Sequence, residues 1–73
     1  MKQLDKVIDN MKDHQMKRAE LLGYHVVLIL AADVYEKALP ELKTKKKVKW
    51  YKGCIVEASD EVARGQVYVT TRE

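Results

Sequence analysis

Apolar residues recur at three- and four-residue steps over the first third of the chain, which is the pattern of an amphipathic helix. The stripe consists of Leu4, Val7, Ile8, Met11, Ala19 and Leu22. Its register is lost near residues 14–16, which argues against a long coiled coil. Gly23 suits the end of such a helix, because glycine adopts the left-handed conformation there at little cost. The pattern predicts a long helix over residues 2–22.

A continuous apolar run follows this helix. Residues 24–30 include five consecutive Val, Leu and Ile residues, which is typical of a central strand buried on both faces. Asp33 then resembles a helix N-cap, and Glu36 three residues later would complete a capping box. A short helix over residues 34–39 would end near Pro40, because proline disfavours helical geometry in the residue before it.

The second half of the chain alternates short strand patterns with turn residues. Strands are predicted at residues 48–51 and 54–57 on either side of Lys52-Gly53, and at residues 66–71, where apolar and polar positions alternate. Ser59 and Gly65 would begin and end a turn between them. We therefore predict one α+β domain over residues 1–73, with the helix in residues 1–23 and, in residues 24–73, a small mixed or antiparallel sheet of three to four strands.

The chain has 73 residues, and a domain of this size buries only a thin core. Either the helix packs on its own sheet, which we favour, or it pairs with a second copy to form a homodimer. Cys54 is the single cysteine, which excludes an internal disulfide and fits a reducing, cytoplasmic setting. The charged N-terminus does not resemble a signal peptide, and no apolar run approaches the length of a membrane span. We therefore expect a soluble protein.

No residue pattern indicates catalysis. A nucleophile elbow, a glycine-rich phosphate loop and a paired-histidine helix are all missing from the sequence. Cys54 and His25 could form a nucleophilic pair after folding, but both lie in apolar strand patterns where structural roles are more common. His14 and His25 have no partners at metal-ligand spacing. We expect a non-enzymatic protein with no catalytic residue, metal or cofactor.

Charge is strongly segregated along the chain. Residues 43–52 contain six lysines and no acid, so that they carry +6 against −3 for the remainder, which together give the net +3. Such segregation usually reports on what a small protein binds. The same stretch contains the only adjacent aromatic pair. The candidate partner-binding residues are Lys43, Lys45, Lys46, Lys47, Lys49, Trp50, Tyr51 and Lys52.

Three interpretations of this segment remain open. The lysines could steer the chain onto an acidic protein surface, with Trp50 and Tyr51 as anchors. They could instead neutralise nucleic-acid phosphates while an aromatic ring stacks on a base. They could also be a solvated segment that protects an edge strand from pairing. We predict the first, a small binding protein that acts as an inhibitor, regulator or accessory factor.

The stretches Val26–Leu30, Asp33–Leu39, Gly53–Val56 and Gly65–Val69 together resemble an element of many tailed-phage coat proteins and small prophage proteins. That element is a strand, a short tyrosine-containing helix, a glycine-led strand and a closing hairpin. The resemblance covers about the last two thirds of the chain. It implies a phage-like origin and action by binding a host or phage macromolecule, and it carries over no binding residue.

Overall fold

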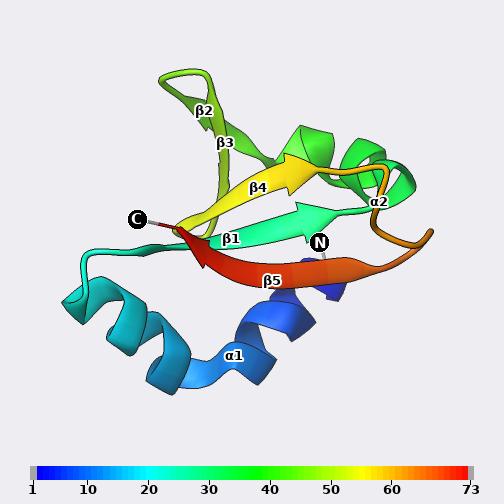
Figure 1. Cartoon of the computed structure of the whole chain (residues 1–73). Coiled ribbons are helices and arrows are strands. Elements are labelled where there is room, and N and C mark those ends of the chain that lie inside the picture. The colour runs from blue at the N-terminus through cyan, green and yellow to red at the C-terminus, as the bar shows by residue number, and fades with distance from the viewer. Residues whose placement is uncertain (1, 73) are drawn as a thin grey trace.

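The computed structural model describes residues 2–72, apart from the side chains of residues 12–16. In chain order it contains helix α1 (Lys2–Leu21), strand β1 (His25–Leu30), helix α2 (Ala32–Ala38), a 3-10 turn η1 (Leu39–Glu41), and strands β2 (Lys43–Lys45), β3 (Val48–Tyr51), β4 (Cys54–Ala58) and β5 (Val67–Arg72) (Figure 1). The α+β class is confirmed. The sheet has five strands, so the prediction of three to four was too low.

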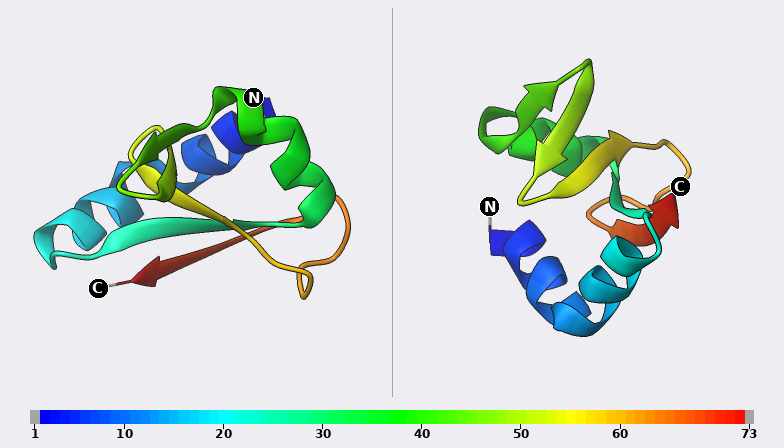
Figure 2. Two further views of the ribbon diagram at one scale, coloured as in Figure 1. Left: turned by 90° about the horizontal axis from the view of Figure 1, so that it is seen from above. Right: turned by 90° about the vertical axis from the view of Figure 1, so that its left-hand side faces the viewer.

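The strands form one mixed sheet in the order β2-β3-β4-β1-β5. β1 is an interior strand that pairs parallel to β4 and antiparallel to β5. β2, β3 and β4 form an antiparallel meander. α2 and the β2–β3 hairpin make the crossover that a parallel β1–β4 pair requires. Both helices lie on the same side of the sheet (Figure 2). One sheet face is therefore covered, and we call the other the open face.

The hydrophobic core lies between the helices and the covered face. Alternate residues of β1 point into it, because side chains along a strand alternate between faces. The helices contribute Leu4, Met11, Ala19, Val34 and Ala38, and the strands contribute Val26, Leu28, Leu30, Tyr51, Cys54 and Val56. Part of the predicted helical stripe thus becomes core, as expected for a helix that packs on its own sheet. Leu22 does not, because it follows the end of α1 and is 58% exposed.

The open face has its own small apolar centre. Val27 is fully buried there although no helix covers it. Arg72 on β5 and Glu57 on β4 lie on either side of β1, opposite His25 and Ile29 respectively. Two hydrogen bonds of 2.5 and 2.9 Å join the guanidinium to the carboxylate. Val27 lies between His25 and Ile29 on β1, so the strand register places this ion pair over its side chain. The ion pair therefore accounts for the burial of Val27.

Gly23 ends α1 as predicted, with a φ of +76°. The Gly23 N–H donates to the Glu20 carbonyl, and the Tyr24 N–H donates to the Ala19 carbonyl. This pair of bonds is the Schellman arrangement, in which glycine provides the left-handed residue. The glycine therefore directs the chain from α1 into β1.

The predicted capping box at Asp33 is wrong. α2 begins at Ala32, and its N-cap is Ala31, which makes no side-chain cap bond. The Asp33 carboxylate instead accepts a hydrogen bond from the Gly65 N–H at 3.1 Å, which ties α2 to the loop before β5. Ser59 does cap its turn, since its hydroxyl accepts the Glu61 N–H. The loss of apolar register near residues 14–16 concerns side chains outside the described residues.

Candidate functional site

The basic segment forms a hairpin and the turn that follows it. β2 and β3 are joined by Lys46 and Lys47, whose φ angles are +52° and +65°. Two positive φ angles in a two-residue connection are the signature of a type I′ turn, whose twist matches that of the paired strands. β3 and β4 then connect through Lys52 and Gly53, at +47° and +82°. We call residues 43–51 the lysine hairpin.

Strand β2 was not predicted from the sequence. Its three residues, Lys43, Thr44 and Lys45, are all exposed and show no apolar alternation. They pair with Trp50, Lys49 and Val48 of β3. The predicted strand at residues 48–51 is confirmed, and the one at 54–57 extends by one residue. β2 forms because the tight turn directs the chain back along β3, which is a tertiary rather than a compositional cause.

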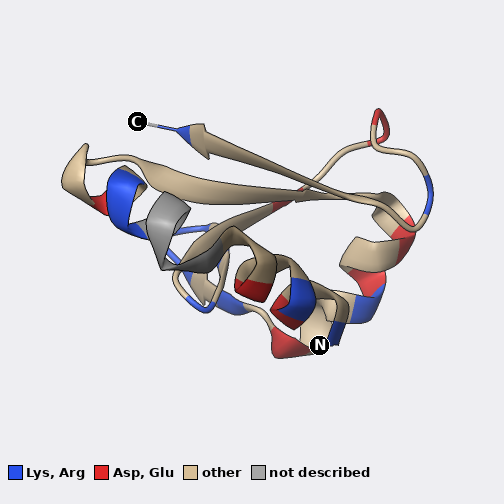
Figure 3. Cartoon of the chain, turned by 90° about the horizontal axis from the view of Figure 1, so that it is seen from below, with Lys and Arg blue, Asp and Glu red and all other residues tan. Residues whose placement is uncertain are grey.

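Four lysines of the hairpin are exposed to solvent. Lys43 and Lys45 extend from β2, and Lys46 and Lys47 occupy the turn, all of them exposed. Among the described residues, no carboxylate lies within ion-pairing distance of these four ammonium groups. We call them the tip cluster. Figure 3 shows basic segments along the hairpin, whereas α1, α2 and the loop before β5 carry both acidic and basic residues.

The base of the hairpin is occupied by the chain's own contacts. The Tyr51 hydroxyl and the Lys52 ammonium both donate to the Asp5 carboxylate on α1, and the lysine lies 2.8 Å from it. These hydrogen bonds lower the pKa of Asp5, and the bond to Asp5 together with burial raises the pKa of Tyr51 to about 12. The Lys52 pKa is raised by the same carboxylate. Neither the spacing nor the composition of the chain indicated that Asp5 would join these residues.

The two aromatic residues differ from the predicted anchors. Tyr51 is only 7% exposed and packs in the core. Trp50 is half-buried on the open face, where its ring meets His25 edge-on at a centroid distance of 5.7 Å. Its indole N–H is buried and has no acceptor among the described residues. Lys49 is also engaged, since its ammonium donates to the Thr44 hydroxyl at 2.6 Å. The four lysines of the tip cluster form no ion pair with any other residue that the structure describes.

The structure does not bring Cys54 and His25 together. Cys54 lies in the core on the covered face, whereas His25 points to the open face beside Trp50. Burial raises the pKa of the Cys54 thiol, which disfavours the thiolate that a nucleophile requires. In the described part of the chain, no three His, Cys, Asp or Glu side chains gather as a metal site. No helix built from these residues is both long and apolar enough to cross a bilayer.

No known protein family, curated protein or solved structure shows a match to this chain. The resemblance to phage proteins therefore stays a prediction, and function has to be argued from the geometry of the hairpin.

Proposed function

We propose that this chain is a non-enzymatic binding protein that docks its tip cluster on an acidic surface of a larger protein, as an inhibitor, regulator or accessory factor. The observation that carries the proposal is the exposure of four lysines with no carboxylate near them among the described residues. Opposite charge on a partner would speed the encounter and select the partner. Tyr51 and Lys52, bonded to Asp5, would hold the hairpin base rather than contact the partner.

The backbone of the turn supports a role for its lysines outside the fold. Left-handed geometry costs a non-glycine residue roughly 1–2 kcal/mol, and type I′ turns strongly favour Asn-Gly. Lys46 and Lys47 both carry this cost, and unlike Lys52, which has a φ of +47° and pairs with Asp5, neither forms an ion pair with the described residues. Strain that the fold does not require is characteristic of functional sites. Lysine at both turn positions is thus better explained by what the turn contacts than by how it folds.

Burial of the aromatic residues favours an acidic protein over single-stranded nucleic acid. Stacking on a base requires an accessible aromatic face near the cationic groups. Tyr51 is buried, and Trp50 is half-buried against His25. Tyr68 is 63% exposed, but it lies on β5 at the opposite edge of the sheet from β2. The tip cluster therefore offers charge without stacking.

The experiment compares two charge-reversal variants with the wild type. In the hairpin variant Lys45, Lys46 and Lys47 become Glu. In the control variant the exposed lysines Lys6, Lys17 and Lys37 become Glu. Each change removes two units of charge per residue, so both variants go from +3 to −3. Each folded protein is immobilised and exposed to a bacterial lysate, once without and once with nuclease treatment, and the captured proteins are identified by mass spectrometry.

We expect the wild type and the control variant to retain the same acidic protein, and the hairpin variant to lose it. Equal loss from both variants would mean that only net charge matters, and the proposal would fail. Capture that disappears after nuclease treatment would favour nucleic acid. In that case four phosphate contacts predict a slope near −3.6 for log affinity against log salt on duplex DNA. If the hairpin variant captures the same protein as the wild type, the lysines do not bind it, and their role is to protect the β2 edge from pairing with other strands.

A further inference from the structure

The two edges of the sheet are very different. β2 forms one edge and has three residues. Two lysines of the tip cluster lie in this strand and the other two lie in the turn that follows it. Charged side chains and short length are the usual protection of an edge strand against pairing. β5 forms the other edge with six residues, Val67–Arg72, of which only Arg72 is charged. That guanidinium is already paired with Glu57 across the open face. The β5 edge thus lacks the protection that β2 has.

The hydrogen-bond pattern identifies the backbone groups that face outward from β5. The Ala31 N–H donates to the Gln66 carbonyl, which makes residues 31 and 66 a hydrogen-bonded pair. Bonded and non-bonded pairs alternate along an antiparallel ladder. With the observed register, residues 68, 70 and 72 therefore bond to β1, and residues 67, 69 and 71 direct their N–H and C=O groups away from it. The Ser59 N–H bond to the Leu30 carbonyl on the β4 side agrees with this pattern.

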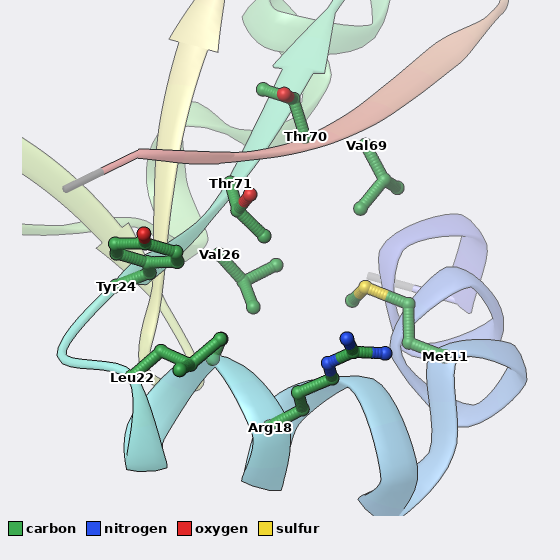
Figure 4. A pocket seen from close by; sticks show the side chains of 9 residues that line it. Met11, Arg18, Leu22, Tyr24, Val26, Val69, Thr70 and Thr71 are labelled. Atoms are coloured by element: carbon green, nitrogen blue, oxygen red, sulfur yellow. The ribbon is translucent and has the colours of Figure 1, made fainter.

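A groove runs beside this edge on the covered side of the sheet. It has a volume of about 370 Å³ and lies between α1 and β5. Its apolar lining comes chiefly from Met11, Leu22, Val26 and Val69, and the Arg18 side chain also lines it (Figure 4). Val67, Val69 and Thr71 point to this same side, because they alternate with the exposed Tyr68. A strand added to β5 would therefore place alternate side chains beside a groove whose lining is mostly apolar.

We propose that β5 pairs antiparallel with β5 of a second copy, so that two five-stranded sheets join into one. Antiparallel pairing is the arrangement that a two-fold axis allows at a shared edge. A register that places Val69 opposite Val69 of the other copy uses the outward groups of residues 67, 69 and 71 in both chains. It sets Val67 opposite Thr71 and Tyr68 opposite Thr70, and each Arg72 lies far from its equivalent.

Two features favour a second copy of this chain as the partner of the β5 edge. The register pairs β5 with itself, and it places no two like charges opposite each other. Alternate side chains of the added β5 would lie beside this mostly apolar groove. This inference does not rest on the tip cluster, which lies at the opposite edge of the sheet. It also differs from the homodimer predicted through the N-terminal helix, because the contact is made by β5.

The test combines solution mass with amide hydrogen exchange on the full chain. Sedimentation equilibrium should give twice 8.5 kDa, that is 17 kDa, and dilution should convert this species into monomer. In the dimer the amides of Val67, Val69 and Thr71 should exchange slowly. On dilution these three alone on β5 should lose protection, while Tyr68 and Thr70 stay bonded to β1. A mass of 8.5 kDa at millimolar concentration would overturn the proposal.

Matched substitutions locate the contact. Thr71→Lys adds a charge at the β5 edge, and Thr44→Lys makes the same change on β2. Both threonines are exposed in the monomer. We expect Thr71→Lys to raise the dimer dissociation constant about tenfold, because the change occurs twice per dimer, and Thr44→Lys to leave it unchanged. Val69→Pro removes an outward N–H that β1 does not use and should give a folded monomer. A dimer that survives Thr71→Lys, or one with new protection on α1 instead of β5, would contradict the proposal.

Discussion

Replacing the strained turn of the lysine hairpin should stabilise the protein. In Lys46→Asn/Lys47→Gly, the residues at φ +52° and +65° become the pair that a type I′ turn favours. Relief of left-handed geometry is worth roughly 1–2 kcal/mol per residue, and the greater flexibility of glycine in the unfolded chain offsets about 0.5–1 kcal/mol. Asparagine relieves only part of the strain. The net gain should be about 1 kcal/mol, which corresponds to a rise in Tm of about 4–8 °C.

The assay is thermal unfolding followed by far-ultraviolet circular dichroism. Removal of two neighbouring charges could also stabilise the hairpin, so the control is Lys46→Gln/Lys47→Gln. That variant loses the same two charges and keeps non-glycine, non-asparagine residues at both positive φ angles. We expect the Asn-Gly variant to unfold several degrees above the Gln-Gln variant. Equal melting temperatures would show that the turn stores no backbone strain, and would remove one support for a functional role of these lysines.

The remaining predictions concern the hairpin base and the core. The raised pKa of Tyr51 means that the folded state holds a proton which the unfolded chain releases, so stability should fall as the pH rises from about 10 to about 12. Asp5→Asn should lower this pKa toward its ordinary value, as followed by phenolate absorbance. The lowered pKa of Asp5 means that stability should fall as the pH drops below 3.8 through its folded value, and this acid-side loss should shrink in Asp5→Asn. Cys54 is fully buried, so a thiol reagent should label it only upon unfolding, and Cys54→Ser should cost about 1–3 kcal/mol in a denaturant titration. Rapid labelling of the native protein would contradict this placement.

Local patterns predicted the elements whose signals lie within a few residues. The apolar periodicity marked α1, and Gly23 ended it through a positive φ angle that other residues adopt at a cost. The β-branched run marked β1. Segregated charge marked the lysine hairpin as a candidate contact surface, and four of its lysines are indeed exposed. Backbone conformation and side-chain periodicity are short-range properties, which is why a single sequence reveals them.

Long-range pairing decided the rest. β2 has no strand pattern of its own and exists because a two-residue turn aligns it with β3. Asp33 was expected to cap a helix, but the approach of Gly65 offered its carboxylate a different donor. Tyr51 and Lys52 were expected to meet a partner, and Asp5, forty-six residues before the tyrosine, occupies them instead. Which polar groups find partners depends on how distant segments pack. Local residue patterns therefore predicted most of the elements and the distribution of charge. The packing of distant segments decided that β2 forms, which lysines make no ion pair with the described residues, and which strand is an unprotected edge.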